Sequence, residues 1–175
     1  VAQVGQPVIE QLRDVSQCSS HLAIRDGRDI IYIARVSAAG SRINQVSIGT
    51  RLPVHCTSLG RMLLTDISRA DFEQLFPQER LPGNTPGQLH DREALWQMVQ
   101  QDKARGYVIG ESFFRHGISS IVYPVFDRSH RVAAVVSILV PSEEIPQADR
   151  ERLQNEVRLA ADKISGFLGY LSQAS

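Results

Sequence analysis

The sequence predicts one α+β domain: a six-stranded, mostly antiparallel sheet flanked by helices, with a long helix at the C-terminus. Three observations predict this class. The expected elements follow the order helix, three strands, helices, three strands, helix. Short turn sequences join neighbouring strands, which favours antiparallel pairing with helices covering the sheet. The length of 175 residues and the hydrophobic content of 42% suit a single domain with its own core.

The N-terminal segment predicts a helix followed by a hairpin. Apolar residues recur at helical spacing over 1–15, and Pro7 lies in the first turns of that helix or at a kink. Residues 19–37 then contain two strand-like runs on either side of Asp26-Gly27. Because Asp-Gly is a strong signal for a tight hairpin turn, we expect two adjacent antiparallel strands here.

The next segments predict a third strand and then helices. Residues 42–54 are expected to form a strand, and the stretch LPVHCTSLGRMLL at 52–64 follows as a loop and a helix. A helix with a serine N-cap is expected over 68–76. After a Pro/Gly loop at 81–87, a further helix over 91–106 ends at a glycine that suits a C-cap.

Three strands are expected in succession in the second half of the chain. They cover residues 107–114, 118–127 and 131–141, and the last two are joined by a tight polar turn at 128–130. Pro124 interrupts the middle strand, which predicts a bulge or a sheet edge at that point.

The C-terminal segment predicts a long helix with one continuous apolar stripe. The members of this stripe alternate four and three residues apart and are Leu153, Val157, Ala160, Ile164, Phe167 and Leu171. Such a stripe packs either on the sheet of its own chain or on a second copy of the chain. The sequence favours packing on the sheet and leaves the dimer helix as the alternative.

Charge balance and cysteine content exclude several classes of protein. Lys+Arg and Asp+Glu both number 19, so we expect no nucleic-acid binding through phosphates by this segment. The longest mostly apolar run, residues 132–140, is too short to span a bilayer, and no signal peptide is recognised. Cys18 and Cys56 are too few for a disulfide framework. A reduced, cytoplasmic setting without a membrane partner fits these features.

The adjacent pair His55-Cys56 raises the question of catalysis or metal binding. Neighbouring side chains on an extended strand point to opposite faces, so His55 would be a poor base for Cys56. We interpret the pair as a small buried cysteine and a half-exposed histidine, with no catalytic residue. The five histidines lack metal-binding spacing, and neither nucleotide-binding glycine motif occurs. The sequence therefore predicts no metal and no cofactor.

Residues 57–60 instead suit a strand-to-helix turn. Thr57 or Ser58 can cap the helix, and the amides of Ser58, Leu59 and Gly60 have no partner within its first turn. Such amides can bind an anion, and Gly60 leaves room for a ligand or a neighbouring strand. On these features alone an ordinary capped helix is favoured. If a ligand does bind here, Gly60→Val is expected to block it while the domain stays folded.

Two serines on apolar strand faces favour a ligand site more strongly. Ser137 is the one polar residue among the alternate positions 133, 135, 137 and 139, and Ser120 shares its face with Ile118 and Val122. A buried hydroxyl needs a hydrogen-bond partner. That partner is either the backbone or a ligand in a mostly apolar pocket with a few polar groups.

These residues are similar to those of a known family. The runs GTRLPVHCTSLGRMLL, RGY and GISSIVYPVFDRSHRVAAVVSILVP, in this order, resemble the effector-binding domain of IclR-type transcriptional regulators. PVIEQL and DGRDIIYIARV near the start extend the resemblance over nearly the whole chain. The resemblance implies a GAF-like effector-binding domain over residues 1–175, with a ligand pocket on one face of the sheet. It also implies an N-terminal winged helix-turn-helix domain, which is absent from this chain.

The resemblance further implies which residues contact the effector. Backbone groups at the helix start correspond to Ser58 and Leu59. Polar contacts from the last strands correspond to Gly110, Ser120, Ser137 and Leu139. Members that bind glyoxylate or pyruvate tend to have Asp at the first of these four positions and Ser at the last. Gly110 and Leu139 make the pocket roomier or more apolar, which disfavours a two- or three-carbon oxoacid.

The run CTSLGRMLL also resembles the subgroup that controls catabolism of aromatic acids. We therefore predict a non-enzymatic sensor domain that binds a small organic acid, with an aromatic ring against the strands and the carboxylate at the helix start. Arg61 would add charge if it points there, a direction the sequence does not give. The predicted ligand-binding residues are Thr57, Ser58, Leu59, Gly60, Gly110, Ser120, Ser137 and Leu139.

The predicted partners are the acid, operator DNA through the absent domain, and further copies of the chain in a dimer or tetramer. Ligand binding would act by changing the arrangement of these subunits. Two alternatives remain open: an enzyme that depends on Cys56, and a dimerisation module without a small ligand.

Overall fold

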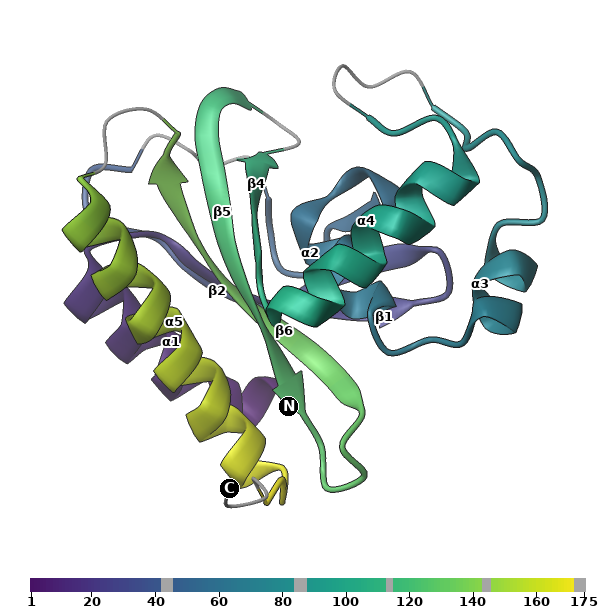
Figure 1. The fold of residues 1–175 in the computed structure, drawn as a ribbon. Coiled ribbons are helices and arrows are strands. Elements are labelled where there is room, and N and C mark those ends of the chain that lie inside the picture. The colour runs from purple at the N-terminus through teal and green to yellow at the C-terminus, as the bar shows by residue number, and fades with distance from the viewer. Residues whose placement is uncertain (42–45, 84–87, 113–114, 143–145, 172–175) are drawn as a thin grey trace.

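Six strands form one antiparallel sheet in the computed structural model, which describes residues 1–41, 46–83, 88–112, 115–142 and 146–171 (Figure 1). The strands are β1 (Ser20–Asp26), β2 (Asp29–Val36), β3 (Arg51–Pro53), β4 (Val108–Ser112), β5 (Arg115–Phe126) and β6 (Val132–Pro141). Their order across the sheet is β3-β2-β1-β6-β5-β4, and every neighbouring pair is antiparallel. The predicted α+β class is confirmed.

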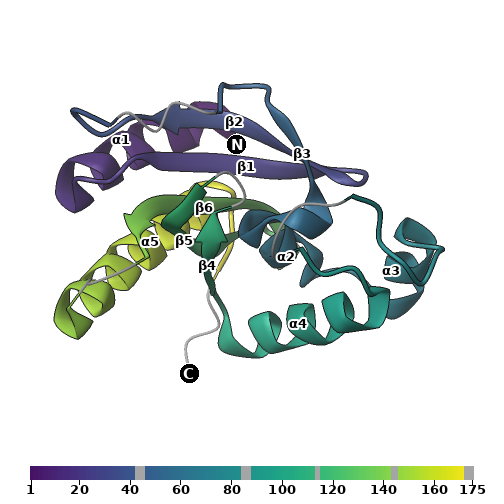
Figure 2. The same ribbon diagram turned by 90° about the horizontal axis from the view of Figure 1, so that it is seen from above.

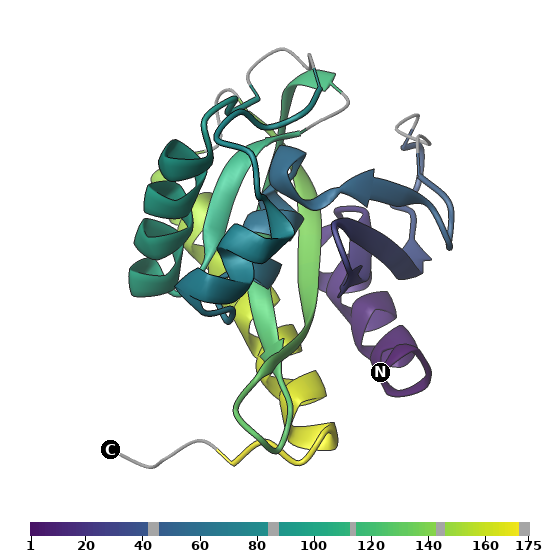
Figure 3. The same ribbon diagram turned by 90° about the vertical axis from the view of Figure 1, so that its right-hand side faces the viewer.

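Two groups of helices cover the two faces of the sheet (Figures 2 and 3). In the described residues these helices are α1 (Ala2–Ser16), the 3-10 helix η1 (Val54–Cys56), α2 (Ser58–Leu64), α3 (Arg69–Leu75), α4 (Arg92–Arg105) and α5 (Gln147–Phe167). The pair α1 and α5 lies on one face, and α2, α3 and α4 lie on the other. Side chains alternate along a strand, so Val135 enters the core under α2 while Val136 enters the core under α5.

Several predicted turns and caps are confirmed. Asp26 lies opposite Asp29 in the β1–β2 hairpin, and Gly27 has the positive φ of 60° that this tight turn requires. Ser68 caps α3 by accepting a hydrogen bond from a first-turn amide. Gly106 ends α4 in the left-handed conformation, with φ of 85°.

The third strand is shorter than predicted. The strand β3 covers Arg51–Pro53 alone. Before it, Gly49 and Thr50 still exchange backbone hydrogen bonds with Tyr32 of β2, but the chain turns here, and the Thr50 amide donates to the Ser47 carbonyl at 3.0 Å. Gly49 has a φ of 89°, which interrupts the extended chain. The predicted strand residues 42–45 lie outside the described residues.

Pro124 lies where β5 extends beyond the end of β4. Pairing between β4 and β5 begins at Val108 opposite Val122, so Pro124 is paired with Val135 of β6 on one side alone. This is the sheet edge that the sequence analysis offered as one explanation for the proline. A register shift follows one residue later, between Val125 and Phe126.

The apolar stripe of α5 packs within its own chain, as favoured from the sequence. Its first four members are buried in the core shared by α1, α5 and the sheet. Its last two members, Phe167 and Leu171, are 58% and 80% exposed. The helix ends at Phe167, so the prediction was wrong in extending it to Leu171. The chain turns at Gly169, which has a φ of 83°.

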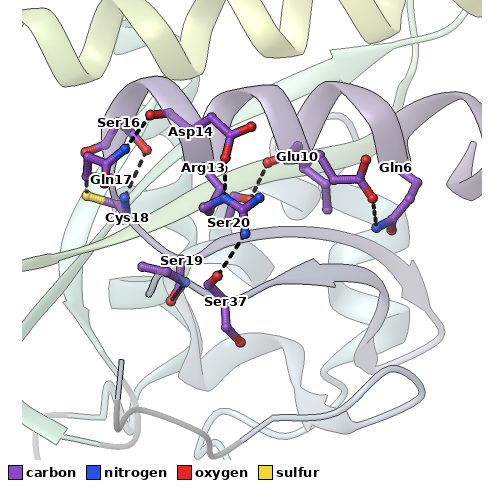
Figure 4. A network of polar contacts seen from close by, with 12 residues as sticks. Gln6, Glu10, Arg13, Asp14, Ser16, Gln17, Cys18, Ser19, Ser20 and Ser37 are labelled. Carbon is purple, nitrogen blue, oxygen red and sulfur yellow. Dashed lines mark hydrogen bonds and ion pairs between the residues drawn. The ribbon is translucent and has the colours of Figure 1, made fainter. Parts of the chain in front are cut away.

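Polar contacts fasten the end of α1 to the start of β1 (Figure 4). The hydroxyl of Ser20 donates to the Ile9 carbonyl at 2.6 Å, and Cys18 Sγ donates to the Ser16 carbonyl at 3.3 Å. Burial raises the pKa of the Cys18 thiol. Both Cys18 and Cys56 are free thiols in the described residues.

Candidate functional site

A short 3-10 helix leads directly into α2 and forms one wall of the candidate site. Thr57 is extended, with φ of −124°, and its side chain accepts a hydrogen bond from the Gly60 amide at 2.8 Å. The Arg61 amide donates to the Thr57 carbonyl at 3.0 Å, which starts the helical hydrogen-bond pattern. The predicted N-cap is therefore confirmed and is Thr57. The amides of Ser58 and Leu59 come before the first intrahelical donor.

Gly60 allows the chain to approach itself closely. A Cβ at this position would overlap with the carbonyl group of Val54 in the preceding turn. A backbone atom cannot move aside as a side chain can, so this geometry opposes the expectation that Gly60→Val would leave the domain folded. A ligand contact at Gly60 stays a prediction, although the amide of Gly60 is already bound to Thr57.

In the described residues, neither ring nitrogen of His55 is hydrogen-bonded to Cys56. Both residues lie in η1 and not on an extended strand, and His55 is buried while Cys56 is half-buried, the reverse of the predicted exposures. His55 Nε2 is 2.9 Å from the carbonyl oxygen of Pro82, so this nitrogen carries the proton and donates. Burial raises the pKa of Cys56 to about 11, which keeps its thiol protonated near neutral pH.

The sheet places three of the predicted site residues in one row. Gly110 of β4 is opposite Ser120 of β5, which is opposite Leu139 of β6. Directly paired residues share a face of the sheet, and this face is the one covered by α2. A Cβ at Gly110 would overlap with the hydroxyl of Ser58, so the start of α2 lies directly over Gly110.

Ser137 lies in the next row, together with a buried histidine. It pairs with Val122 on one side and with His21 on the other. Within the described part of the chain, the hydroxyl of Ser137 is buried without a hydrogen-bond partner. Burial and the positive charge of Arg35 lower the pKa of His21 to about 3, so this histidine is neutral. Its ring packs edge-on against Tyr32, with ring centroids 5.5 Å apart.

A small polar pocket opens beside the N-terminus of α2. Its volume is about 130 Å³, and it is lined by His55, Cys56, Thr57, Ser58, Arg61, Gln88, Leu89 and Glu111. Two predicted residues, Thr57 and Ser58, are among these, and Gly110 adjoins Ser58. Ser120 and Ser137 are buried in the sheet below and do not line the pocket.

Arg61 enters this pocket from α2 and is held there by a buried carboxylate. Its Nε donates to Asp102 Oδ2 at 2.8 Å, and Asp102 Oδ1 is 3.2 Å from Nη2 of Arg105. The side chain of Asp102 is fully buried and that of Arg61 is 19% exposed. Asp102 was not predicted as a site residue, because an aspartate on the polar helix 91–106 gives no signal of burial.

Residues 1–166 match the family model described as bacterial transcriptional regulator IclR C-terminal. The chain belongs to this family. The chain spans little more than half the length of one relative that it matches, the Pca regulon regulatory protein of Pseudomonas putida. The two are 31% identical over 161 residues, which cover 91% of this chain and 55% of that protein.

Solved structures of transcriptional regulators share the fold. A transcriptional regulator from Rhodococcus sp. RHA1 matches with a TM-score of 0.85 and 29% identity, covering 95% of this chain and 69% of that one. An IclR homolog from Microbacterium hydrocarbonoxydans was solved in complex with 4-hydroxybenzoate. It matches with a TM-score of 0.82 and 26% identity, and the match covers 95% of this chain and 67% of that one. The chain is thus an effector-binding domain of the IclR type.

Two further absences concern the described residues alone. In that part of the chain, no group of three or more His, Cys, Asp or Glu side chains is arranged to hold a metal ion. None of the helices there combines the length and apolar character needed to cross a membrane.

Proposed function

We propose that this domain senses a small organic acid, in particular an aromatic carboxylate, and so controls DNA binding by a winged helix-turn-helix domain outside the chain. The pocket beside α2 is the observation that supports this proposal. It combines the cation of Arg61, the hydroxyls of Thr57 and Ser58, and the apolar side chain of Leu89. A volume of about 130 Å³ lies below the range of roughly 300–1,000 Å³ of drug-sized sites, which suits a small ligand.

An aromatic acid is supported by both relatives and residues. One structural relative was solved with 4-hydroxybenzoate, and the Pca regulon protein is among the related sequences. Gly110 and Leu139 add no charged or hydroxyl group to the row that they share with Ser120. The ring would lie toward this row, and the carboxylate toward Arg61 and the amides of Ser58 and Leu59.

Regulation would follow from a change in subunit arrangement. A ligand shifts such an equilibrium to the extent that it binds one arrangement more tightly than the other. The zero net charge of this chain gives no basis for holding DNA directly, so operator binding would belong to the domain outside it. The regulator would act in the cytoplasm.

We favour a sensor over an enzyme. The rival that uses Cys56 needs a thiolate, and the burial that raises the pKa of this thiol to about 11 opposes its formation. The relative from Pseudomonas putida is named as a regulatory protein.

Titration calorimetry with the purified chain tests the function. The panel comprises benzoate, 4-hydroxybenzoate and protocatechuate, with pyruvate, glyoxylate and methyl benzoate as comparisons. We expect at least one aromatic acid to bind more tightly than either oxoacid, and methyl benzoate to bind more weakly than benzoate. Failure of all these acids to bind, in calorimetry and in native mass spectrometry, would contradict the proposal.

A further inference from the structure

We propose that Arg61 is the residue that binds the ligand carboxylate, and that Asp102 is the positioning residue that fixes Arg61 for this role. This inference rests on the proposed acid-binding function and adds the identity of its charged contact. The sequence placed the carboxylate on backbone amides and left the direction of Arg61 open.

The guanidinium of Arg61 retains unused donors inside the pocket. It carries five N–H groups, and the bond from Nε to Asp102 occupies one of them. In the described residues, this is the one hydrogen bond that the side chain makes. Its Nη2 lies 3.7 Å from the place where a Cβ of Gly110 would be, next to the Ser58 hydroxyl. The remaining donors therefore lie in the pocket wall.

The charges around Arg61 leave a net positive centre. Asp102 is shared by two cations, Arg61 and Arg105, so one positive charge of this group is not neutralised. Glu111 lines the same pocket, but it is exposed at the rim, where water weakens its field. A ligand carboxylate that reached Arg61 would neutralise the remaining charge in a partly dehydrated site.

Two other arginines, Arg69 and Arg131, contact carboxylates that they do not share with a second arginine of the described residues. Arg69 contacts Glu73 and Glu93, and its side chain is 38% exposed. Arg131 contacts Asp66 and is 62% exposed. Arg61 differs because it is less exposed, lines a pocket and shares its single acidic partner. Planar, forked donors of this kind favour paired hydrogen bonds to a carboxylate.

Asp102 limits the orientation of Arg61. Its carboxylate is fully buried on α4, so it can neither rotate into water nor follow a moving arginine. Because Asp102 accepts from Nε of Arg61, the N–H groups on Nη1 and Nη2 remain to contact a ligand. Replacing Asp102 should therefore weaken binding without removing the charge that contacts the ligand.

Calorimetry with benzoate and its neutral analogue benzamide tests these roles. For Arg61→Gln we expect the affinity for benzoate to fall by about 10-fold to 150-fold, the equivalent of losing one hydrogen bond to a charged group. The affinity for benzamide should fall less than that for benzoate, because the amide has one acceptor oxygen and no negative charge to neutralise the cation. Arg61→Lys and Asp102→Asn should give smaller losses for benzoate, again without a matching loss for benzamide.

Arg131→Gln is the matched control. It removes an arginine that also pairs with an aspartate but lies outside the pocket beside α2 and outside the Asp102 group, so benzoate binding should stay within about threefold of wild type. Thermal unfolding checks that each variant is folded, and Arg61→Lys decides the question if Arg61→Gln does not fold.

These experiments distinguish failure of the Arg61 inference from failure of the proposed function. If wild-type protein binds benzoate and Arg61→Gln or Arg61→Lys binds it equally well, the role of Arg61 is refuted and the sensor function stands. Equal losses for benzoate and benzamide would show a structural role only, and would also refute the inference. If wild-type protein binds none of the acids, the inference falls together with the proposed function.

Discussion

Arg61 on α2 and Asp102 on α4 form an ion pair, with 2.8 Å between Nε and Oδ2, around a carboxylate that has no exposed surface. The pair joins two helices, and its two residues are 41 positions apart in the sequence. A buried carboxylate requires its partners, because charge that is removed from water without compensation is costly.

This pair predicts that removing a buried acid destabilises the domain more than removing an exposed acid does. Asp102→Ala should lower the free energy of unfolding by about 1–3 kcal/mol, because it leaves two neighbouring cations without their shared acid. Asp162→Ala, which removes an exposed partner of Arg158, should cost less than about 0.5 kcal/mol. Urea unfolding measures both. Equal losses would show that the buried pair contributes no more than a surface pair.

Gly60 is predicted to be essential for folding. Gly60→Ala should destabilise the domain by about 3 kcal/mol or more, because the new Cβ would overlap with the backbone of Val54. Gly166→Ala is the control, since a Cβ there meets nothing within 4 Å on α5. That change should be neutral or stabilising by up to about 1 kcal/mol. A Gly60→Ala protein with wild-type stability in thermal unfolding would contradict this account of the turn.

The buried histidine predicts a loss of stability in acid. His21 has a folded-state pKa of about 3, below the ordinary value of 6.5, so below pH 6.5 the unfolded chain takes up a proton that the folded chain does not. The stability that neutral His21 contributes is fully present above pH 6.5 and is lost as the pH falls toward 3. Within this range the free energy of unfolding can fall by up to about 1.4 kcal/mol per pH unit.

Urea unfolding between pH 7 and pH 4.5 measures this slope. His21→Gln cannot take up a proton, so its stability should fall less steeply with decreasing pH than that of wild type. Parallel curves for the two proteins would mean that His21 does not stay neutral in the folded state.

Ser137 predicts opposite effects on folding and on binding. Ser137→Ala should leave the free domain as stable as wild type or stabilise it by up to about 1 kcal/mol, because the buried hydroxyl has no partner in the described residues. If the ligand reaches this hydroxyl, the same change should weaken binding by about 0.5–1.5 kcal/mol. Paired unfolding and calorimetry experiments separate the two. Unchanged affinity would remove Ser137 from the site.

Self-association is predicted to use surfaces other than the four buried residues of the α5 stripe. Phe167 and Leu171 are the exposed members of that stripe. We expect a dimer or tetramer at micromolar concentration in sedimentation experiments, and we expect Phe167→Ser to weaken association if the end of α5 takes part. A single species of 19.5 kDa at these concentrations would contradict the prediction.

Most of the fold could be predicted from local sequence signals. Asp26-Gly27, the Ser68 cap and the Gly106 cap were each readable because a turn or helix end depends on a few adjacent residues. The strands in the second half were readable for a similar reason, since their apolar runs are long. The length of the third strand was predicted wrongly because Gly49 lies within an otherwise strand-like segment, and local composition does not show where a strand begins.

The sequence by itself determined the fold class, a helix start capped by Thr57 or Ser58, and the family resemblance that the comparisons confirmed. Tertiary structure decided the rest of the site. It placed Gly60 against Val54, gave Arg61 its direction through Asp102, and buried His21 beside Ser137. These relationships join residues that are distant in sequence or meet through backbone atoms. Periodicity and spacing report which face of an element is apolar, but not which element packs on it, and burial and charge pairing depend on that packing.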